Sequence, residues 1–271
     1  MVPEKNLVDR STAPQTVASL AEDLDRLGLP AGETVLVHSS LSSLGWVCGG
    51  AVALVEALLS VLGPSGTLVV PTHSDDLSDP AQWANPPVPE SWWDTIRATM
   101  PAYRPASTPT RGMGAVPEVV RTWPDARRSD HPQVSFAAVG PASLRITGGH
   151  SLADGLGEGS PLARLYELDA SILLLGVGHD RNTSLHLAEY RSGVRARVQQ
   201  SGPVLVEGER SWVSWTDIDL DVDDLAPLGA DLDRSGLVHV GSVGNASARR
   251  MKQRRVVDYA TEWFRRRQPP R

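Results

Sequence analysis

Apolar and polar positions alternate along the first third of the chain in a way that predicts a helix followed by a strand–helix–strand unit. The apolar positions of residues 12–30 share one helical face: Val17, Leu20, Leu24 and Leu27. Residues 33–40 and 66–74 are apolar runs of strand length, and residues 51–63 between them fit a buried helix. A crossover at this spacing predicts that the two strands are parallel.

The later chain continues this pattern. Strands are predicted over residues 134–140 and 170–178, with a short helix over residues 160–169 between them. Residues 202–221 alternate as an antiparallel hairpin does, with EGER as its turn. Residues 249–267 carry apolar side chains at helical spacing among arginines, which predicts an amphipathic helix docked on the core.

Residues 74–114 show no sustained helical or strand periodicity, because prolines and tryptophans interrupt the pattern of apolar and polar positions. We predict an irregular insertion here, with one helix over residues 90–100, that forms either a binding wall or a satellite of the core. The whole pattern predicts a single domain over residues 1–271 of the α/β class. Its helices are expected to be layered on both faces of a central, largely parallel sheet, with a smaller antiparallel or irregular part appended.

Polar residues follow three of the predicted strands. They are His38, Ser39 and Ser40 after the first, His73, Asp75 and Asp76 after the second, and His179, Asp180 and His186 after the third. Ligands of open parallel sheets bind beyond the carboxyl ends of the strands. We therefore predict that these residues converge at one edge of the sheet.

His186 stands out among them because of its neighbour Glu189. Residues 182–191 fit a helix on which these two side chains share a face. A carboxylate one turn away holds an imidazole and raises its basicity, which a general base near neutral pH needs. A histidine that is only hydrogen-bonded within the core is the alternative.

Composition narrows the classes of function. A net charge of −6 argues against a nucleic-acid surface and suits a cationic partner. The single cysteine, Cys48, excludes an intrachain disulfide and a thiolate metal cluster. The start MVPEKNLVDR has no secretory signal, and no apolar run reaches the length of a membrane span, so we expect a cytoplasmic protein without membrane contact.

Motifs of several common chemistries do not occur. The chain has no Gly-Lys-Ser/Thr phosphate loop, no Gly-x-Ser-x-Gly and no His-Glu-x-x-His, so a metal-dependent hydrolase stays an alternative without a local motif. The serines, glycines and free backbone amides of residues 38–50 suit an anion such as a pyrophosphate, and an ordinary capping loop is the alternative.

Six stretches occur in order that strongly resemble the antibiotic N-acetyltransferases acting on the 3-amino group of aminoglycosides. They are VHSSLSSLG, TPTRGMGAVPE, RSDHPQVSFAAVG, GHSLADGLGEGSPLARLYELD, LLLGVGHDRNTSLHLAEYR and GSVGNASARRMKQRRVVDYA. The resemblance covers about residues 12–265. It implies direct transfer of an acetyl group from acetyl-coenzyme A to a polycationic aminoglycoside, without a metal ion, which confers resistance to the antibiotic. It also implies a layered α/β fold that is distinct from the fold of the GNAT acetyltransferases.

The resemblance also implies roles for individual residues. His186 is the catalytic base, Glu189 is its acidic partner, and His38 is either catalytic or positions the cofactor. The acetyl-coenzyme A contacts are His38, Ser39, Ser40, Leu41, Thr110, Arg111, Gly112 and Met113. The carboxylates facing the cationic substrate are Asp75, Asp154, Glu158 and Glu189, with helix capping or pairing to arginines as the alternative for the first three.

Family resemblance leaves the acceptor amine open. A biosynthetic amine or an amino-phosphonate is an alternative substrate, and residues 74–114 are the segment expected to select it. A non-catalytic coenzyme A binding module and a metal-dependent hydrolase are the alternatives from other classes. The sequence fits a monomer or a homodimer equally.

Overall fold

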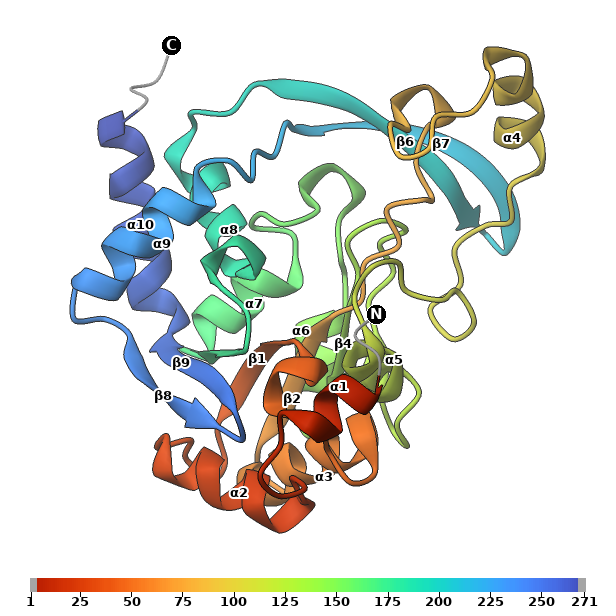
Figure 1. The fold of residues 1–271 in the computed structure, drawn as a ribbon. Coiled ribbons are helices and arrows are strands. Elements are labelled where there is room, and N and C mark those ends of the chain that lie inside the picture. The colour runs from red at the N-terminus through yellow and green to blue at the C-terminus, as the bar shows by residue number, and fades with distance from the viewer. Residues whose placement is uncertain (1–3, 268–271) are drawn as a thin grey trace.

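The computed structural model describes residues 4–267, which form a central sheet covered by helices on both faces (Figure 1). Seven strands of the described chain make up this sheet: β1 (Thr34–Ser39), β2 (Thr67–Pro71), β3 (Arg127–Arg128), β4 (Phe136–Val139), β5 (Ser171–Leu175), β8 (His239–Val243) and β9 (Ala246–Lys252). Their order across the sheet is β3-β4-β2-β1-β5-β9-β8. The predicted α/β class is therefore confirmed.

The centre of the sheet is parallel and its flanks are antiparallel. Leu36 of β1 lies beside Val69 of β2 on one side and Ile172 of β5 on the other, and both pairings are parallel. The helix α3 (Gly50–Leu62) makes the crossover from β1 to β2, as predicted. β4 and β9 run antiparallel to their inner neighbours. The sheet is thus mixed rather than largely parallel, in part because a tight hairpin joins β8 to β9 and forces antiparallel pairing.

Each face of the sheet carries its own apolar core, because successive side chains of a strand point to opposite faces. Val35 and Val37 belong to the core under α2 (Val17–Arg26), α3 and α5 (Ala115–Arg121), whereas Leu36 belongs to the core on the other face. The helices of that second face are α6 (Ser143–Thr147), α7 (Pro161–Glu167), α8 (Ser184–Ser192), α9 (Leu225–Arg234) and α10 (Gln253–Arg267). The expected layering is confirmed.

The appended antiparallel part is a long hairpin of β6 (Arg197–Val206) and β7 (Glu209–Ile218). Its two turn residues, Glu207 and Gly208, both have positive φ, as tight hairpin turns require. In Figure 1 the hairpin arches away from α8 toward α4 (Trp93–Thr99) in the predicted insertion. The hairpin expected from the alternation of residues 202–221 is confirmed and begins five residues earlier.

The insertion is irregular apart from α4 and two 3-10 turns, η2 (Pro80–Gln82) and η3 (Glu90–Trp92). It is bound to the hairpin at several points. The amide of Tyr103 donates to the Pro203 carbonyl at 3.0 Å, and Arg210 Nε donates to the Met100 carbonyl at 2.8 Å. The insertion and the hairpin therefore form one connected part of the structure.

The C-terminal prediction is correct only in part. The helix begins at Gln253. The preceding residues 246–252 form β9, which places Ala246 and Ala248 in the core on one face of the sheet and Met251 in the core on the other face. A further short helix, α1 (Glu4–Asp9), precedes α2. None of the helices in residues 4–267 is both long and apolar enough to cross a membrane.

Candidate active site

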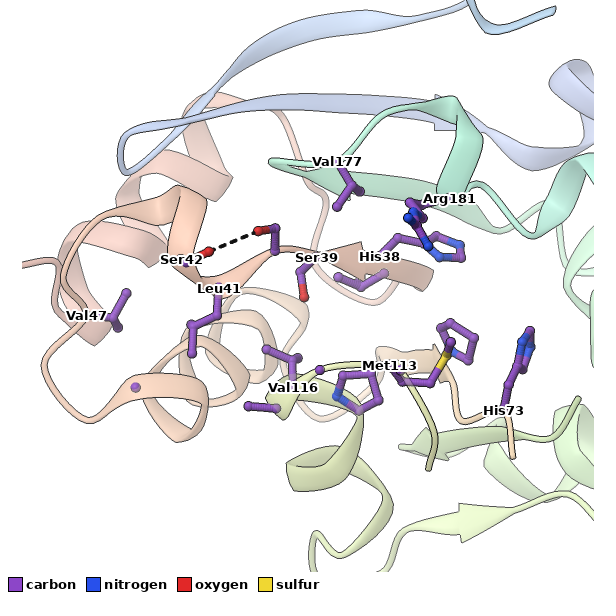
Figure 2. Close-up of a pocket in the computed structure, with 18 of the residues that line it drawn as sticks. His38, Ser39, Leu41, Ser42, Val47, His73, Met113, Val116, Val177 and Arg181 are labelled. Carbon is purple, nitrogen blue, oxygen red and sulfur yellow. Dashed lines mark hydrogen bonds between the residues drawn. The ribbon is translucent and has the colours of Figure 1, made fainter. Parts of the chain in front are cut away.

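A cavity of about 950 Å³ lies at the carboxyl ends of β1, β2 and β5. Its walls come from the 3-10 turn η1 (Leu41–Leu44), the segment leading into α5, and the segment between β5 and α8. Residues that line it include His38, Ser39, Ser40, Leu41, Val47, His73, Gly112, Met113, Val116, Val177, Arg181 and His186. Figure 2 shows Leu41, Val47 and Val116 around one part of the cavity and His38, His73 and Met113 around another. The predicted convergence is confirmed for residues from all three strand ends, namely His38, Ser39, Ser40, His73, Asp180 and His186. It is wrong for Asp75, Asp76 and His179, which are not among the residues that line the cavity.

The exit from β5 brings the chain against η1 and then into α8. Gly176 has φ +65°, and a Cβ there would lie 2.4 Å from Ser43 Cβ, so glycine is required at this crossing. A single 3-10 turn, η5 (His179–Arg181), follows and leads to Thr183 at the start of α8. This path places His186 in the first turn of α8, at the wall of the cavity.

His186 and Glu189 form a close hydrogen-bonded pair. The imidazole Nδ1 lies 2.5 Å from Glu189 Oε2, and the Glu189 side chain has no exposed surface. Glu189 Oε1 accepts from Arg195 Nε at 2.5 Å and from the amide of Asp221 at 3.3 Å. A carboxylate facing Nδ1 favours the tautomer with its proton on that atom, which leaves Nε2 of His186 to accept a proton.

Two further histidines at the cavity are neutral at pH 7. Burial, together with the nearby charge on His186, lowers the pKa of both His38 and His73 to about 3. The Nε2 atom of each is buried and has no hydrogen-bond partner among the described residues. Buried polar atoms without partners are uncommon in folded proteins, and a ligand is one of the things that satisfies them. Each ring therefore places a nitrogen atom that lacks a hydrogen-bond partner near His186.

The loop of residues 150–160 is held by buried histidines and by α8. It contains the 3-10 turn η4 (Leu152–Asp154), and His150 Nε2 lies 2.7 Å from the Gly155 carbonyl. Tyr190 of α8 donates to Asp217 Oδ1 at 2.6 Å, and Asp217 Oδ2 accepts from the Gly155 amide at 3.1 Å. The helix that carries His186 thus also fixes the position of this loop.

These histidines predict an acid-sensitive fold. Burial lowers the pKa of His150 to about 3 and that of His131 to about 4, whereas an unfolded histidine titrates near 6.5. Between those values the unfolded chain binds more protons, so stability falls as the pH falls. We expect each buried histidine to cost about 2 kcal/mol of unfolding free energy at pH 5 relative to pH 8.

Urea unfolding from pH 8 to pH 5 measures this effect. His150→Gln is expected to reduce the pH dependence by about one proton, whereas the same change at the exposed His239 leaves it unaltered. An unchanged pH dependence in His150→Gln would contradict the assignment of a buried neutral histidine at this position.

Comparison with known proteins places the chain in a single family. Residues 36–265 match the sequence model of the aminoglycoside 3-N-acetyltransferases. The chain belongs to this family. It is 46% identical over 261 residues to the SPbeta prophage-derived aminoglycoside N(3')-acetyltransferase-like protein YokD of Bacillus subtilis (strain 168), covering 96% of each chain. It is 37% identical over 279 residues to aminoglycoside N(3)-acetyltransferase VII of Streptomyces paromomycinus, covering 96% of this chain and 95% of that one.

Solved structures of aminoglycoside acetyltransferases share the fold. AAC(3)-Xa superposes with a TM-score of 0.91 at 34% identity over 98% of both chains. AAC-VIa bound to sisomicin has a TM-score of 0.85 at 32% identity, covering 95% of this chain and all of that one. AAC-IIIb in binary complex with CoASH has a TM-score of 0.84 at 29% identity, covering 96% of this chain and all of that one.

Most of the residues predicted to contact acetyl-coenzyme A lie at the cavity. His38, Ser39, Ser40, Leu41, Gly112 and Met113 line it, whereas Thr110 and Arg111 are not among the lining residues. The Thr110 amide donates to Glu118 Oε1 at 2.6 Å, and the exposed Arg111 lies 3.9 Å from Asp76. These two residues adjoin the cavity through the chain that leads to Gly112.

The carboxylates predicted to face the substrate lie outside the cavity lining. Asp75 is exposed just beyond β2, and Asp154 accepts a hydrogen bond from the Gly159 amide. Glu158 accepts from Arg191 Nε at 2.6 Å, which is the arginine pairing considered as the alternative for these acids. Glu189 stands behind His186 and contacts the cavity only through it.

Other polar residues have positions that the sequence pattern did not specify. His179 is buried against Gly229 of α9, with Nε2 3.1 Å from Asp233, so it joins α9 to the turn η5 that follows β5. Within residues 4–267, no three His, Cys, Asp or Glu side chains are grouped so that they could hold a metal ion. The sequence pattern did not predict the contact of Arg195 with Glu189, because a single arginine after a helix does not stand out in a chain that contains many arginines.

Proposed function

We propose that this protein transfers an acetyl group from acetyl-coenzyme A to the 3-amino group of an aminoglycoside, in the cytoplasm, by direct transfer with His186 as general base. The observation that carries the proposal is the His186–Glu189 pair at the wall of a cavity shared with the loop after β1. Membership of the aminoglycoside 3-N-acetyltransferase family supports the reaction class. The relatives solved with sisomicin and with CoASH support the two ligand classes.

His186 supplies the proton chemistry in this proposal. An aliphatic amine is mostly protonated at neutral pH and becomes nucleophilic only when it loses a proton. After the ammonium has lost one proton to water, the neutral amine attacks the thioester carbonyl. Nε2 of His186 accepts a second proton from the attacking nitrogen as the C–N bond forms, and Glu189 stabilises the resulting imidazolium through Nδ1. His186 then returns the proton to the departing thiolate, with His38 as the other candidate donor.

The loop after β1 supplies the groups that face the reacting carbonyl. The amide of Ser40 already donates to the Leu175 carbonyl at 2.9 Å. We therefore assign the stabilisation of the developing oxyanion to the amides of Leu41 and Ser42, which open η1 and precede its first internal hydrogen bond. Cys48 is exposed and is not needed as an acyl carrier.

The cavity walls fit an acyl-coenzyme A. Leu41, Val47 and Val116 offer apolar surface, and His38, with its unsatisfied Nε2, offers a polar group beside them. The residues that would hold this substrate are His38, Ser39, Ser40, Leu41, Gly112 and Met113, with Thr110 and Arg111 next to them. Bound there, acetyl-coenzyme A supplies the activated acetyl group.

Carboxylates outside the cavity would receive the cationic acceptor. Burial raises the pKa of Asp154, and the nearby charges of Asp217 and Glu158 raise it further. Neighbouring carboxylates gain from the approach of a polycation, so we propose that Asp154 and Glu158 attract the aminoglycoside and that Asp75 does so from its separate position beyond β2. This attraction is expected to weaken as salt is added.

Release of free coenzyme A from acetyl-coenzyme A tests the function directly. We expect release that depends on an aminoglycoside, KM for the aminoglycoside that rises with salt, and an acetylated product modified at the 3-amino group by mass spectrometry and NMR. Release with other amines but with no aminoglycoside would transfer the proposal to another acceptor. Coenzyme A binding without release for any amine would make the protein a binding module.

A further inference from the structure

Arg195 is a buried cation behind the proposed base. It lies in the short link between α8 and β6, and only 8% of its side chain is exposed. Its Nε contacts Glu189 Oε1 at 2.5 Å, and its two terminal nitrogens contact Asp221 at 3.3 Å and Asp224 at 3.2 Å. The ring of Phe264 in α10 lies 5.4 Å from the guanidinium carbon. The guanidinium is therefore held on every side by carboxylates and an aromatic ring.

Glu189 is the partner on which the charge of Arg195 acts most strongly. The Glu189 side chain is fully buried, whereas those of Asp224 and Asp221 are 15% and 43% exposed. Water screens charge pairs at exposed positions far more than at buried ones. The second oxygen of Glu189 faces His186, so the three side chains form one line from the buried cation to the cavity.

We propose that Arg195 is a positioning residue for the proton transfer, which keeps Glu189 anionic and turned toward His186 and so sets the pH at which His186 is free to accept a proton. This inference rests on the proposed function. His186 and Glu189 share a hydrogen bond of 2.5 Å, and a cation beside this pair opposes the uptake of a proton by either side chain. Without Arg195 the pair would hold a proton at higher pH. Nε2 of His186 would then already carry a proton at the pH at which it has to accept one from the amine.

The other charged groups near the pair do not replace Arg195. His38 and His73 face His186 from the sheet, but both are neutral above about pH 4 because burial lowers their pKa to about 3. Asp221 and Asp224 are anionic and favour proton uptake by the pair. Arg267 of α10 lies 3.9 Å from Asp224 and is 56% exposed, so its charge is screened from Glu189.

Arg195 also connects the base to the β6–β7 hairpin. It precedes the first strand of the hairpin, and Asp221 follows the second, while the Asp219 amide donates to the Ala196 carbonyl at 2.8 Å. The Asp221 amide donates to the same Glu189 oxygen that Arg195 contacts. Both ends of the hairpin therefore meet at Glu189, and the base and the hairpin keep a fixed relation.

NMR titration of His186 in histidine-labelled protein tests the proposal, with Arg195→Gln as the variant. We expect the titration midpoint to rise by at least about one pH unit, and the acidic limb of kcat/KM to move with it. Arg195→Lys, which keeps the charge, is expected to move less than half as far. Arg249→Gln is the matched control, because Arg249 pairs with Asp233 at 3.1 Å and does not contact the pair.

The NMR measurement needs no acetyl transfer, so a wild-type protein that acetylates no amine defeats the proposed function and leaves the test of Arg195 intact. A folded Arg195→Gln protein in which His186 titrates as in wild type overturns the proposal. If Arg195→Gln alone does not unfold cooperatively, the test uses the double variant Glu189→Gln/Arg195→Gln, in which neither member of the ion pair is charged. Recovery of cooperative unfolding supports the proposal, and failure to recover overturns it, because Arg195 would then serve other contacts.

Discussion

Replacing His186 by glutamine is expected to lower kcat/KM for acetyl transfer by about 10²–10⁴-fold, which is the range for removal of a general base. Glutamine can still contact Glu189 but cannot accept a proton from an amine. Because the side chain lies at the edge of the cavity rather than in the apolar core, we expect the affinity for acetyl-coenzyme A to stay within a few-fold of wild type. Steady-state kinetics and calorimetric binding of coenzyme A measure the two quantities.

His38→Gln is the comparison that identifies the base. His38 lines the same cavity and is neutral at pH 7. If His38→Gln abolishes transfer while His186→Gln retains wild-type rates, then His38 is the base and the assignment of His186 is wrong. His239→Gln, at an exposed position of β8, serves as the unaltered control.

Replacing Glu189 by alanine is expected to lower the free energy of unfolding by about 3–5 kcal/mol, because it leaves the buried Arg195 without its most buried partner. The same change removes the group that orients His186, so kcat/KM is expected to fall as well. Urea unfolding and steady-state kinetics, both at pH 7.5, measure these effects.

Glu189→Gln separates the two roles of this side chain. It keeps the size of Glu189 and a hydrogen-bonding oxygen but removes the charge, so we expect a smaller loss of stability than in Glu189→Ala. Transfer should remain impaired, because an uncharged partner stabilises the imidazolium less. A Glu189→Ala protein as stable as wild type would show that the contact with Arg195 contributes little to folding.

Long apolar runs and the ends of strands were the parts of this structure that the sequence predicted best. The three central strands are buried on both faces, so their composition alone marks them. Since parallel strands align their carboxyl ends, the sequence pattern alone is enough to place His38 and His186 near one another. The helical spacing of His186 and Glu189 likewise predicted the pair that the structure contains.

Contacts between distant segments were not predictable in the same way. Residues 249–252 of β9 resemble an extension of the C-terminal helix, because Met251 stands among arginines and a lysine and no alternation marks the strand. Ala246 and Ala248 face one core, whereas Met251 faces the other. Arg195 is 6 residues from Glu189 in sequence, beyond the end of the helix, and no local spacing rule connects them. The partners of the acidic residues were not predictable either, because a pair such as Glu158 and Arg191 is 33 residues apart in the chain and forms only in the folded protein.

The bonds between the insertion and the hairpin bear on how enzymes of this kind could be recombined. Asp79 and Tyr103 of the insertion contact Ser201 and Pro203 of β6, although about a hundred residues separate them in the chain. A chimaera that borrows only one of the two segments from a relative would break these bonds and leave buried donors unpaired. We therefore expect that the two segments can be exchanged between relatives only together.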